Sequence, residues 1–542
     1  MRARDAMSGT ATANHRCVAR APHGDAARTE FVTDRDVLAG VAHDAAFVQG
    51  AASALVTPHD ETGVAAALRG AAHVLPVGAQ SSLTGGATPM GEAVLSLARF
   101  TRIDLLENGV RVGAGVHLRD LQAALAGANR YFPPVPAYDG AQVGGAVSTN
   151  AAGPATFKYG TVRGWVQAIT VMLAGGDVLD LERGQCLASQ DGHFEVVTSR
   201  GTLHVPVPTY IMPNVAKCSA GYFAQPGMDL LDLFVGAEGT LGVITEVTLG
   251  TVTPAPKVAV AFVPCRSEAQ AFALTRALRE EAFLARAGDE LGLDVSAVEY
   301  LDARSLDLVR EDGADRRVHV ALPPGARALL LVQFELHDKH ATQMNDDLAN
   351  ALLGEADDGP VARLVRLLVR FDLVDHAEIA PPDDARRRMA LLALREAVPD
   401  AVNTRVCRAQ LEGRGVAKVG VDMIVPFERL EEATNAYRSA FESRGLDHAI
   451  WGHLSDGNLH PNVLARTPGE VEAARNAVLV LGEVIMALGG CPLAEHGVGR
   501  NLTKQELLRR MYGDAAIYQM RLVKRALDPD GKLAPGNIFT QT

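Results

Sequence analysis

Three glycine-rich stretches in the first half of the chain limit the folds that are open to it. Their sequences are LPVGAQSSLTGGA, QVGGAVSTNAAG and LFVGAEGTLGVIT, and they occupy residues 75–87, 142–153 and 233–245. Short runs rich in β-branched residues lie around them, at residues 72–77, 110–112, 166–173, 203–207 and 243–249. Such runs, separated by glycine clusters, are typical of strands joined by tight turns.

The same stretches have the composition of a ligand-binding surface. In the first, successive backbone N–H groups can converge on an anion, with hydroxyl side chains as further donors. The second has no charge and no large side chain, which suits close approach to a flat, bulky ligand. In the third, the lone Glu238 needs a polar partner if it is buried. Taken singly, the stretches are also explained by ordinary turns or by a tightly packed Gly/Ala helix start.

The overall composition excludes several classes of protein. The chain has 542 residues, of which 48% are hydrophobic, and its formal net charge is −12. This apolar content is typical of globular proteins, and the acidic balance argues against nucleic-acid binding, which needs clustered Lys and Arg. The six cysteines lie far apart without a CxxC pair, which argues against a structural zinc site, an iron–sulfur cluster or a disulfide scaffold. No uncharged apolar run reaches 18 residues, so we expect no membrane span.

The N-terminus lacks the apolar segment of a secretory signal. Its Arg/Ala/Thr-rich composition leaves a transit peptide open as the alternative, but we expect a disordered tail over residues 1–30, because unbound termini are usually disordered. We therefore expect a reduced, cytoplasmic protein.

The sequence pattern changes after Thr253-Pro254-Ala255-Pro256, because two prolines in three positions stop both strands and helices. Ser267 and Gln270 have capping-box spacing and predict a helix start. Further strands are predicted at residues 258–263, 328–336, 419–425 and 449–453, and helices at 341–353, 384–395, 428–443, 468–488 and 503–527. This alternation predicts an α+β domain of split βαβ type. Residues 364–374 are apolar with interspersed arginines, which favours a buried element over an interfacial membrane contact.

Two short motifs near the C-terminus concentrate histidine and carboxylate side chains. WGHLSDGNLH at residues 451–460 places His453 and His460 on either side of an Asp-Gly turn, so flanking strands could aim both at one point. EHGVG at residues 495–499 adds Glu495 and His496. Two histidines and one carboxylate with an open position form a plausible divalent-metal set. The simpler alternative is a group of surface and core histidines with no shared site.

In order and spacing, the glycine-rich stretches resemble the flavin-binding domain of the vanillyl-alcohol oxidase / p-cresol methylhydroxylase (PCMH) superfamily. The two histidine motifs resemble the Gly-His-x-Gly-Asp-Gly-Asn-x-His and Glu-His-Gly signatures of the FAD-linked 2-hydroxyacid dehydrogenases. That group contains D-lactate dehydrogenases, the flavin subunit of glycolate oxidase and D-2-hydroxyglutarate dehydrogenase. The resemblance covers residues 30–542 and is loosest around residues 300–380.

The resemblance implies an α+β fold in four parts. Residues 1–30 are the tail, and residues 31–255 form a two-part PCMH-type FAD-binding domain. Residues 256–465 form a substrate (cap) domain with an antiparallel, ferredoxin-like sheet. Residues 466–542 form a helical C-terminal segment that returns to the FAD-binding domain.

The resemblance also implies FAD as the cofactor. The residues expected to contact it are Pro76, Val77, Gly78, Ala79, Gln80, Ser81, Ser82, Gly85, Val143, Gly144, Gly145, Thr149, Asn150, Ala152, Gly153, Tyr159, Gly160, Glu238, Gly239, Gly242, Val243, Ile244, Asn458 and Asn537. Residues 75–87 contain no histidine, the residue that carries the flavin linkage in covalent members, so non-covalent binding is expected. The chain departs from the family pattern at Val77, Gln142, Ala152, Ala237 and Ser455. The first four changes leave the backbone contacts available, and Ser455 is a mild departure.

By resemblance, His453, His460 and Glu495 hold a divalent metal, Zn or Mn, and His496 is the catalytic base. Arg395 matches a family arginine that binds the substrate carboxylate, and Lys418 matches a family lysine at a looser spacing. A solvated helix arginine is the simpler reading of Arg395. The chemistry suits these residue types, because a neutral imidazole can take a hydroxyl proton and a metal on the same oxygen lowers its pKa.

The resulting prediction is an enzyme that oxidises a D-2-hydroxy acid of the D-lactate or glycolate class to the 2-oxo acid, with hydride transfer to flavin N5. The alternatives are a D-2-hydroxyglutarate dehydrogenase, a flavoprotein transferase similar to alkylglycerone-phosphate synthase, and a non-catalytic flavoprotein subunit. Without an iron–sulfur or haem motif, the electrons must leave to a quinone, a cytochrome, an electron-transfer flavoprotein, a partner subunit or oxygen. A homodimer and a peripheral contact at the inner membrane face stay open.

Overall fold

The computed structural model describes residues 14–25, 29–134, 136, 138–355 and 358–540. The chain forms two lobes, and the chain passes from the first to the second after β11 (Val243–Leu249). One hydrophobic cluster runs through both lobes and includes Val110, Val332 and Leu459. Among the described residues, no helix combines the length and the apolar character that crossing a membrane requires.

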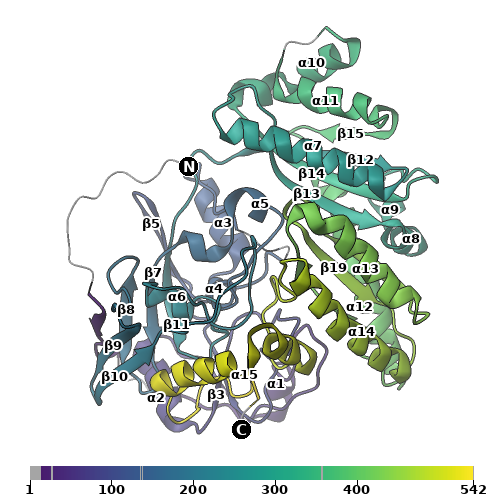
Figure 1. Cartoon of the computed structure of the whole chain (residues 1–542). Helices are drawn as coiled ribbons and strands as arrows, with labels where there is room; N and C mark the ends of the chain where they lie inside the picture. Colours follow the sequence, from purple (N-terminus) through teal and green to yellow (C-terminus); the bar gives the residue numbers. More distant parts are fainter. Residues whose placement is uncertain (1–13, 26–28, 135, 137, 356–357, 541–542) are drawn as a thin grey trace.

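The first lobe has two parts, as expected from the resemblance (Figure 1). A parallel sheet of order β2-β4-β3 forms the smaller part, with strands β2 (Ala54–Val56), β3 (Val74–Val77) and β4 (Ala93–Ser96). Helices α1 (Arg35–Ala39) and α2 (Glu61–Gly70) belong to it, and Asp60 caps α2 by accepting a hydrogen bond from the Gly63 N–H.

The larger part of this lobe contains two further sheets. A five-stranded antiparallel sheet has the order β5-β6-β11-β7-β8, with β5 (Ile103–Leu106), β6 (Gly109–Gly113), β7 (Val166–Met172) and β8 (Val178–Glu182). A three-stranded sheet has the order β1-β9-β10, with β1 (Arg16–Val18), β9 (His193–Thr198) and β10 (Gly201–Pro206). The helices are short: α3 (Leu118–Ala126), α4 (Val143–Ser148), α5 (Thr156–Tyr159) and α6 (Leu231–Phe234), with a 3-10 turn at Val162–Trp165.

The second lobe is built on an eight-stranded sheet. Its first four strands, β12 (Lys257–Cys265), β13 (Asp294–Asp302), β14 (Ala328–Leu336) and β15 (Glu378–Ala380), pair antiparallel in the order β15-β12-β14-β13. This is the predicted ferredoxin-like arrangement. The sheet continues through β18 (His448–His453), β19 (Asn458–Val463), β16 (Val419–Gly420) and β17 (Met423–Ile424).

The helices of the second lobe connect these strands. They are α7 (Glu268–Arg286), α8 (Ala303–Glu311), α9 (Ala314–Arg317), α10 (Asp338–Leu353), α11 (Pro360–Arg370), α12 (Ala385–Leu411) and α13 (Leu430–Glu442). Helix α7 starts as predicted, because the Ser267 hydroxyl accepts from the Gln270 N–H. The segment at 364–374 falls mainly in α11, whose buried face contains Leu364 and Leu368. That burial agrees with the expected buried element.

Four elements differ from the sequence-based expectation. Strand β1 lies within the tail that was expected to be disordered over residues 1–30, where it pairs with β9, whereas residues 1–13 and 26–28 of that tail lie outside the described residues. The strand predicted at residues 419–425 is two short strands, β16 and β17, because Asp422 between them turns its carboxylate into a buried polar cluster. Helix α12 continues to Leu411 instead of ending near Arg395, and it contains Pro399. Strand β13 was not predicted, although it carries a buried glutamate, Glu299.

The C-terminal segment returns to the first lobe. Helices α14 (Pro468–Ala487) and α15 (Leu502–Leu527) pack together, and Figure 1 shows α15 in yellow across the lower part of the first lobe. Beyond α15, Leu533 forms a β-bridge with Val74, and the Lys532 ammonium donates to the carbonyl oxygens of Leu68 and Ala71. The end of the chain therefore packs beside the first glycine-rich stretch.

The turn between β18 and β19 depends on Gly457. Its φ is +84°, and an added Cβ would lie 2.2 Å from the carbonyl oxygen of Val425. Gly445 is a matched control, because its φ of +65° is also left-handed but an added Cβ would meet nothing within 4 Å.

We expect Gly457→Ala to lower the free energy of unfolding by about 2–4 kcal/mol, since strain and a backbone clash add. Gly445→Ala should cost only the left-handed strain, about 1–2 kcal/mol. Urea unfolding of both variants measures the difference. Equal losses would show that the turn at Gly457 can relax.

Candidate active site

The hairpin of β18 and β19 brings the two predicted metal-binding histidines together. Trp451 lies opposite His460, and His453 lies opposite Asn458. The imidazole rings of His453 and His460 are 5.2 Å apart, centroid to centroid, and nearly perpendicular. Glu495 reaches them from the loop after α14, with Oε1 3.3 Å from His453 Nε2 and Oε2 3.8 Å from His460 Nε2. All three side chains are buried, and each offers one ligand atom within 4.8 Å of the others.

A chain of polar contacts orients His453. Its Nδ1 lies 2.5 Å from Glu299 Oε1, and Glu299 Oε2 accepts from Arg395 Nε at 2.8 Å. Burial alone would lower the pKa of His453, but the carboxylates of Glu299 and Glu495 raise it to about 9. With Nδ1 held by a carboxylate, Nε2 faces Glu495, which is the usual arrangement of a metal-binding histidine and its supporting carboxylate.

His460 has the opposite electrostatic character. Burial holds its pKa well below the ordinary value, so the imidazole is neutral near pH 7. Its Nδ1 is buried and has no hydrogen-bond partner among the described residues. A neutral imidazole with an unused nitrogen, beside a second imidazole and a carboxylate, is a donor set that fits a divalent cation.

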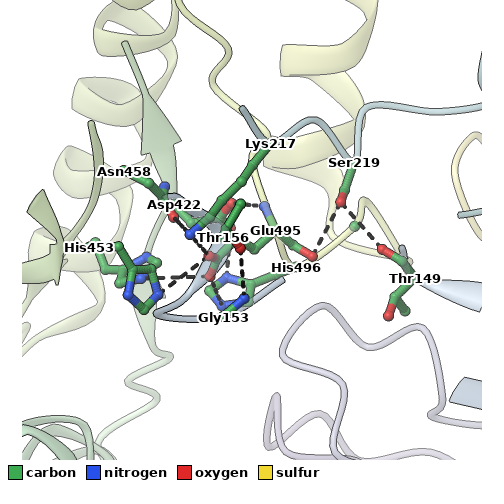
Figure 2. A network of polar contacts seen from close by, with 12 residues as sticks. Thr149, Gly153, Thr156, Lys217, Ser219, Asp422, His453, Asn458, Glu495 and His496 are labelled. Atoms are coloured by element: carbon green, nitrogen blue, oxygen red, sulfur yellow. Dashed lines mark hydrogen bonds and ion pairs between the residues drawn. The ribbon is translucent and has the colours of Figure 1, made fainter. Parts of the chain in front are cut away.

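Lys217 is a buried residue of the site that the sequence analysis missed. It lies in the long connection between β10 and α6 and is 0% exposed. Its ammonium contacts Glu495 (Figure 2). It also lies 2.9 Å from Asp456 Oδ2. Burial alone would lower the pKa of Lys217, but these two carboxylates raise it. A signal was present in NVAKCSAGYFA at residues 214–224, where a lone lysine lies among small or uncharged residues.

The neighbouring His496 is held by a different carboxylate. Its Nδ1 lies 2.6 Å from Asp422 Oδ2, and Asp422 also accepts from the Glu495 N–H and from Lys504. Burial alone would raise the pKa of Asp422, but His496 and Lys504 hold it far below the ordinary value. The His496 side chain is 31% exposed and is the most open imidazole of the cluster. Its Nε2 lies 4.0 Å from Glu495 Oε2.

The two cations expected at the substrate carboxylate lie in different places. Arg395 is buried beside the cluster, with its Nε bound to Glu299. Lys418 instead donates to Asn403 Oδ1 at 2.8 Å. Asn403 is eight residues beyond Arg395 on α12, which is about 12 Å along a helix.

The three glycine-rich stretches meet in the first lobe. The N–H groups of Gly236 and Glu238 donate to carbonyl oxygens of Val147 and Ser148, which joins the third stretch to the second. Asn537 Nδ2 donates to the carbonyl oxygens of Gly86 (2.9 Å) and Glu238 (3.3 Å), which joins the chain end to the first and third.

Between these segments the structure keeps room for a ligand. An added Cβ on Gly145 would meet nothing within 4 Å. Nearby, Gln142 Oε1 is buried without a hydrogen-bond partner among the described residues, and it lies 3.4 Å from the position of a Cβ on Gly78. This backbone-lined cradle with an unsatisfied polar atom fits a bulky polar cofactor such as FAD.

Several side chains expected at the cofactor make protein contacts instead. Glu238 accepts from the N–H groups of Val498 and Gly499, both at 2.7 Å, and burial raises the pKa of Glu238 to about 7. The Tyr159 hydroxyl donates to Glu335, across the boundary between the lobes. Asn458 contacts Lys217 through Oδ1 and donates to the Met423 carbonyl oxygen.

Comparison with known families defines the class of protein. Residues 255–538 match the family "FAD linked oxidases, C-terminal domain", and residues 52–182 match "FAD binding domain". The chain belongs to the FAD linked oxidases. It is an FAD-linked oxidoreductase of the D-lactate, D-2-hydroxyglutarate and glycolate oxidase type, and FAD is its cofactor. The predicted family, the PCMH-type fold and the enzymatic character are confirmed.

Particular relatives are similar over most of their length. The chain is 25% identical to D-lactate dehydrogenase [cytochrome] 1, mitochondrial, of Saccharomyces cerevisiae, covering 86% of this chain and 68% of the relative. It is 28% identical to D-2-hydroxyglutarate dehydrogenase, mitochondrial, of Danio rerio (93% and 82%) and 26% identical to glycolate oxidase subunit GlcD of Bacillus subtilis (86% and 84%). A solved alkyldihydroxyacetonephosphate synthase has the same fold, with a TM-score of 0.58 at 14% identity over 93% of this chain and 82% of that chain.

The environment of Lys418 predicts a pH-dependent stability. Burial lowers the pKa of Lys418 from 10.5 to about 8. Below pH 8 the lysine is charged in both the folded and the unfolded state, so the folded protein bears the full cost of burying this charge. Between pH 8 and 10.5 only the unfolded state keeps the proton, so this cost declines as the pH rises.

We therefore expect Lys418→Met to raise the free energy of unfolding by about 1–3 kcal/mol at pH 7, and by clearly less at pH 9.5. Chemical denaturation of both proteins at the two pH values gives the difference. A variant that is less stable than the wild type at pH 7 would contradict the assignment.

Proposed function

We propose that this protein oxidises a D-2-hydroxy acid, of the D-lactate or glycolate class, to the 2-oxo acid. The observation that carries the proposal is that His453, His460 and Glu495 meet in a buried cluster. His496, whose imidazole is held by Asp422, lies beside this cluster. The relatives support it, because D-lactate dehydrogenases and a glycolate oxidase subunit are among them.

The three glycine-rich stretches and Asn537 would hold FAD, which supplies a two-electron acceptor when bound. We propose that the binding is non-covalent, because residues 75–87 contain no histidine. His453, His460 and Glu495 would hold a divalent metal, Zn or Mn, which supplies a Lewis acid for the substrate hydroxyl when bound.

The protein's own groups then have distinct tasks. His496 Nε2 takes the proton of the substrate hydroxyl, while Asp422 fixes the Nδ1–H tautomer and the ring orientation. The guanidinium of Arg395 binds the substrate carboxylate through the donors that Glu299 does not use. Lys217 and Glu299 are positioning residues, since each contacts a proposed metal ligand.

A second candidate function is a flavoprotein transferase. It is favoured by the structural similarity to alkyldihydroxyacetonephosphate synthase. The phosphorylated substrate of a transferase of this kind needs a cluster of cations. Lys217 and Lys504 are each paired with a carboxylate, so the guanidinium donors that Arg395 does not give to Glu299 suit a single carboxylate, which favours the hydroxy acid.

The direct test is an anaerobic screen that follows bleaching of the flavin in the purified holoenzyme. D-lactate, glycolate or D-2-hydroxyglutarate should bleach it, whereas L-lactate should not. Acid precipitation should release the flavin into the supernatant. Product formation from an alkyl glycerone phosphate, without bleaching by any hydroxy acid, would favour the transferase.

The roles of His496 and His460 can be separated. We expect His496→Asn to lower kcat by about 10²–10⁴-fold, the usual scale for loss of a general base, and to retain the metal. His460→Ala should lose both metal and activity. Steady-state kinetics and elemental analysis measure the two effects. Loss of metal from His496→Asn would make His496 a ligand instead of the base.

A further inference from the structure

A second group of histidine and carboxylate side chains lies on the three-stranded sheet β1-β9-β10. Figure 1 shows this sheet at the outer edge of the first lobe, on the side away from the second lobe. His15, His193 and Glu195 each offer one ligand atom there, and these atoms lie within 4.8 Å of one another. All three residues are half-buried.

The sheet geometry explains why these side chains meet. His193 and Glu195 are two residues apart on β9, so they point to the same face. His204 on β10 lies opposite Glu195 in the antiparallel register and belongs to that face too. His15 immediately precedes β1, which pairs with the other edge of β9. The His193 ring is 5.4 Å from that of His15 and 6.2 Å from that of His204.

His193 is held in an orientation suited to metal binding. Its Nδ1 lies 2.8 Å from the Ser189 hydroxyl and 3.2 Å from Asp191 Oδ1. These partners leave Nε2 as the nitrogen that is available to a ligand. A histidine whose second nitrogen is fixed by a polar partner is the common arrangement at metal sites, and His453 with Glu299 shows it in the active site.

We propose that His15, His193 and Glu195 form a second, surface site for a divalent transition metal of the Zn²⁺ class. Imidazole and carboxylate donors in this ratio favour zinc over Mg²⁺ or Ca²⁺, which prefer oxygen ligands. His204 is close enough to complete a fourth position by a change of rotamer. A metal here ties β1, a strand of three residues, to β9 and so secures the N-terminal segment. The site is independent of the proposed function.

One neighbouring residue opposes metal binding. Arg16 Nε lies 3.9 Å from Glu195 Oε2, and the Arg16 side chain is 55% exposed. An exposed ion pair of this kind is weak, so a metal can displace it. Removal of the arginine should therefore tighten metal binding, which a merely structural role of Glu195 would not produce.

The test uses the full-length holoenzyme, stripped with a chelator and titrated with Zn²⁺ alone by calorimetry, with bound zinc counted by elemental analysis. We expect His193→Ala to lose one equivalent of zinc and to keep wild-type flavin reduction. Arg16→Gln should bind that zinc about three- to tenfold more tightly. His337→Ala, an exposed histidine on the other lobe, is the matched control and should bind as the wild type does.

The outcomes separate this site from the active-site metal. Loss of zinc from His460→Ala but not from His193→Ala would overturn the surface site. Loss of zinc from His193→Ala but not from His460→Ala would overturn only the active-site metal. If His193→Ala does not fold, the zinc content of His15→Ala tests the site instead. This variant loses no side-chain hydrogen bond, because the His15 side chain makes none among the described residues. Zinc should also slow tryptic cleavage after Arg16 in the wild type. An unchanged cleavage rate would contradict the proposal that the metal ties β1 to β9.

Discussion

The buried carboxylate of Glu495 is the group on which the arrangement of the active site depends. An ionised carboxylate in the protein interior is costly unless it is paired and hydrogen-bonded. Here the partners come from both lobes, since Lys217 belongs to the first and His453 and His460 to the second. These partners hold the pKa of Glu495 well below its ordinary value. Glu495 itself lies in the C-terminal loop, so one charge joins three distant parts of the chain.

Two carboxylate–histidine pairs extend from this centre, and they have different surroundings. Glu299 and His453 are both buried, so His453 is suited to a fixed, structural role such as metal binding. Asp422 is equally buried, but its partner His496 is partly open, so His496 can reach a substrate. The same pairing thus serves two purposes because the exposure of the imidazole differs. Lys504, which donates to Asp422 and to the Gly497 carbonyl oxygen, fixes the loop that carries both His496 and Glu495.

Sequence patterns predicted the class of fold and many of its elements. The β-like runs at residues 243–249 and 328–336 match strands β11 and β14, and the Ser267 cap marks the start of α7. These predictions succeeded because hydrophobic periodicity and capping are local. Strand β13 was not predicted because Asp294, Ser296 and Glu299 interrupt its apolar pattern. Helix α12 was predicted too short because Pro399 is a residue that normally ends a helix.

The sequence by itself determined the chemistry that is available, namely a glycine-rich surface for FAD and a compact set of histidines with Glu495. The short hairpin made the closeness of His453 and His460 predictable from local spacing, whereas their closeness to Glu495 was implied by the family resemblance. Only the tertiary structure decided which partners complete the site. Lys217 meets Glu495 across 278 positions, and Glu299 meets His453 across 154. No local pattern encodes such pairings, because they arise when burial forces charged groups from separate elements to neutralise one another.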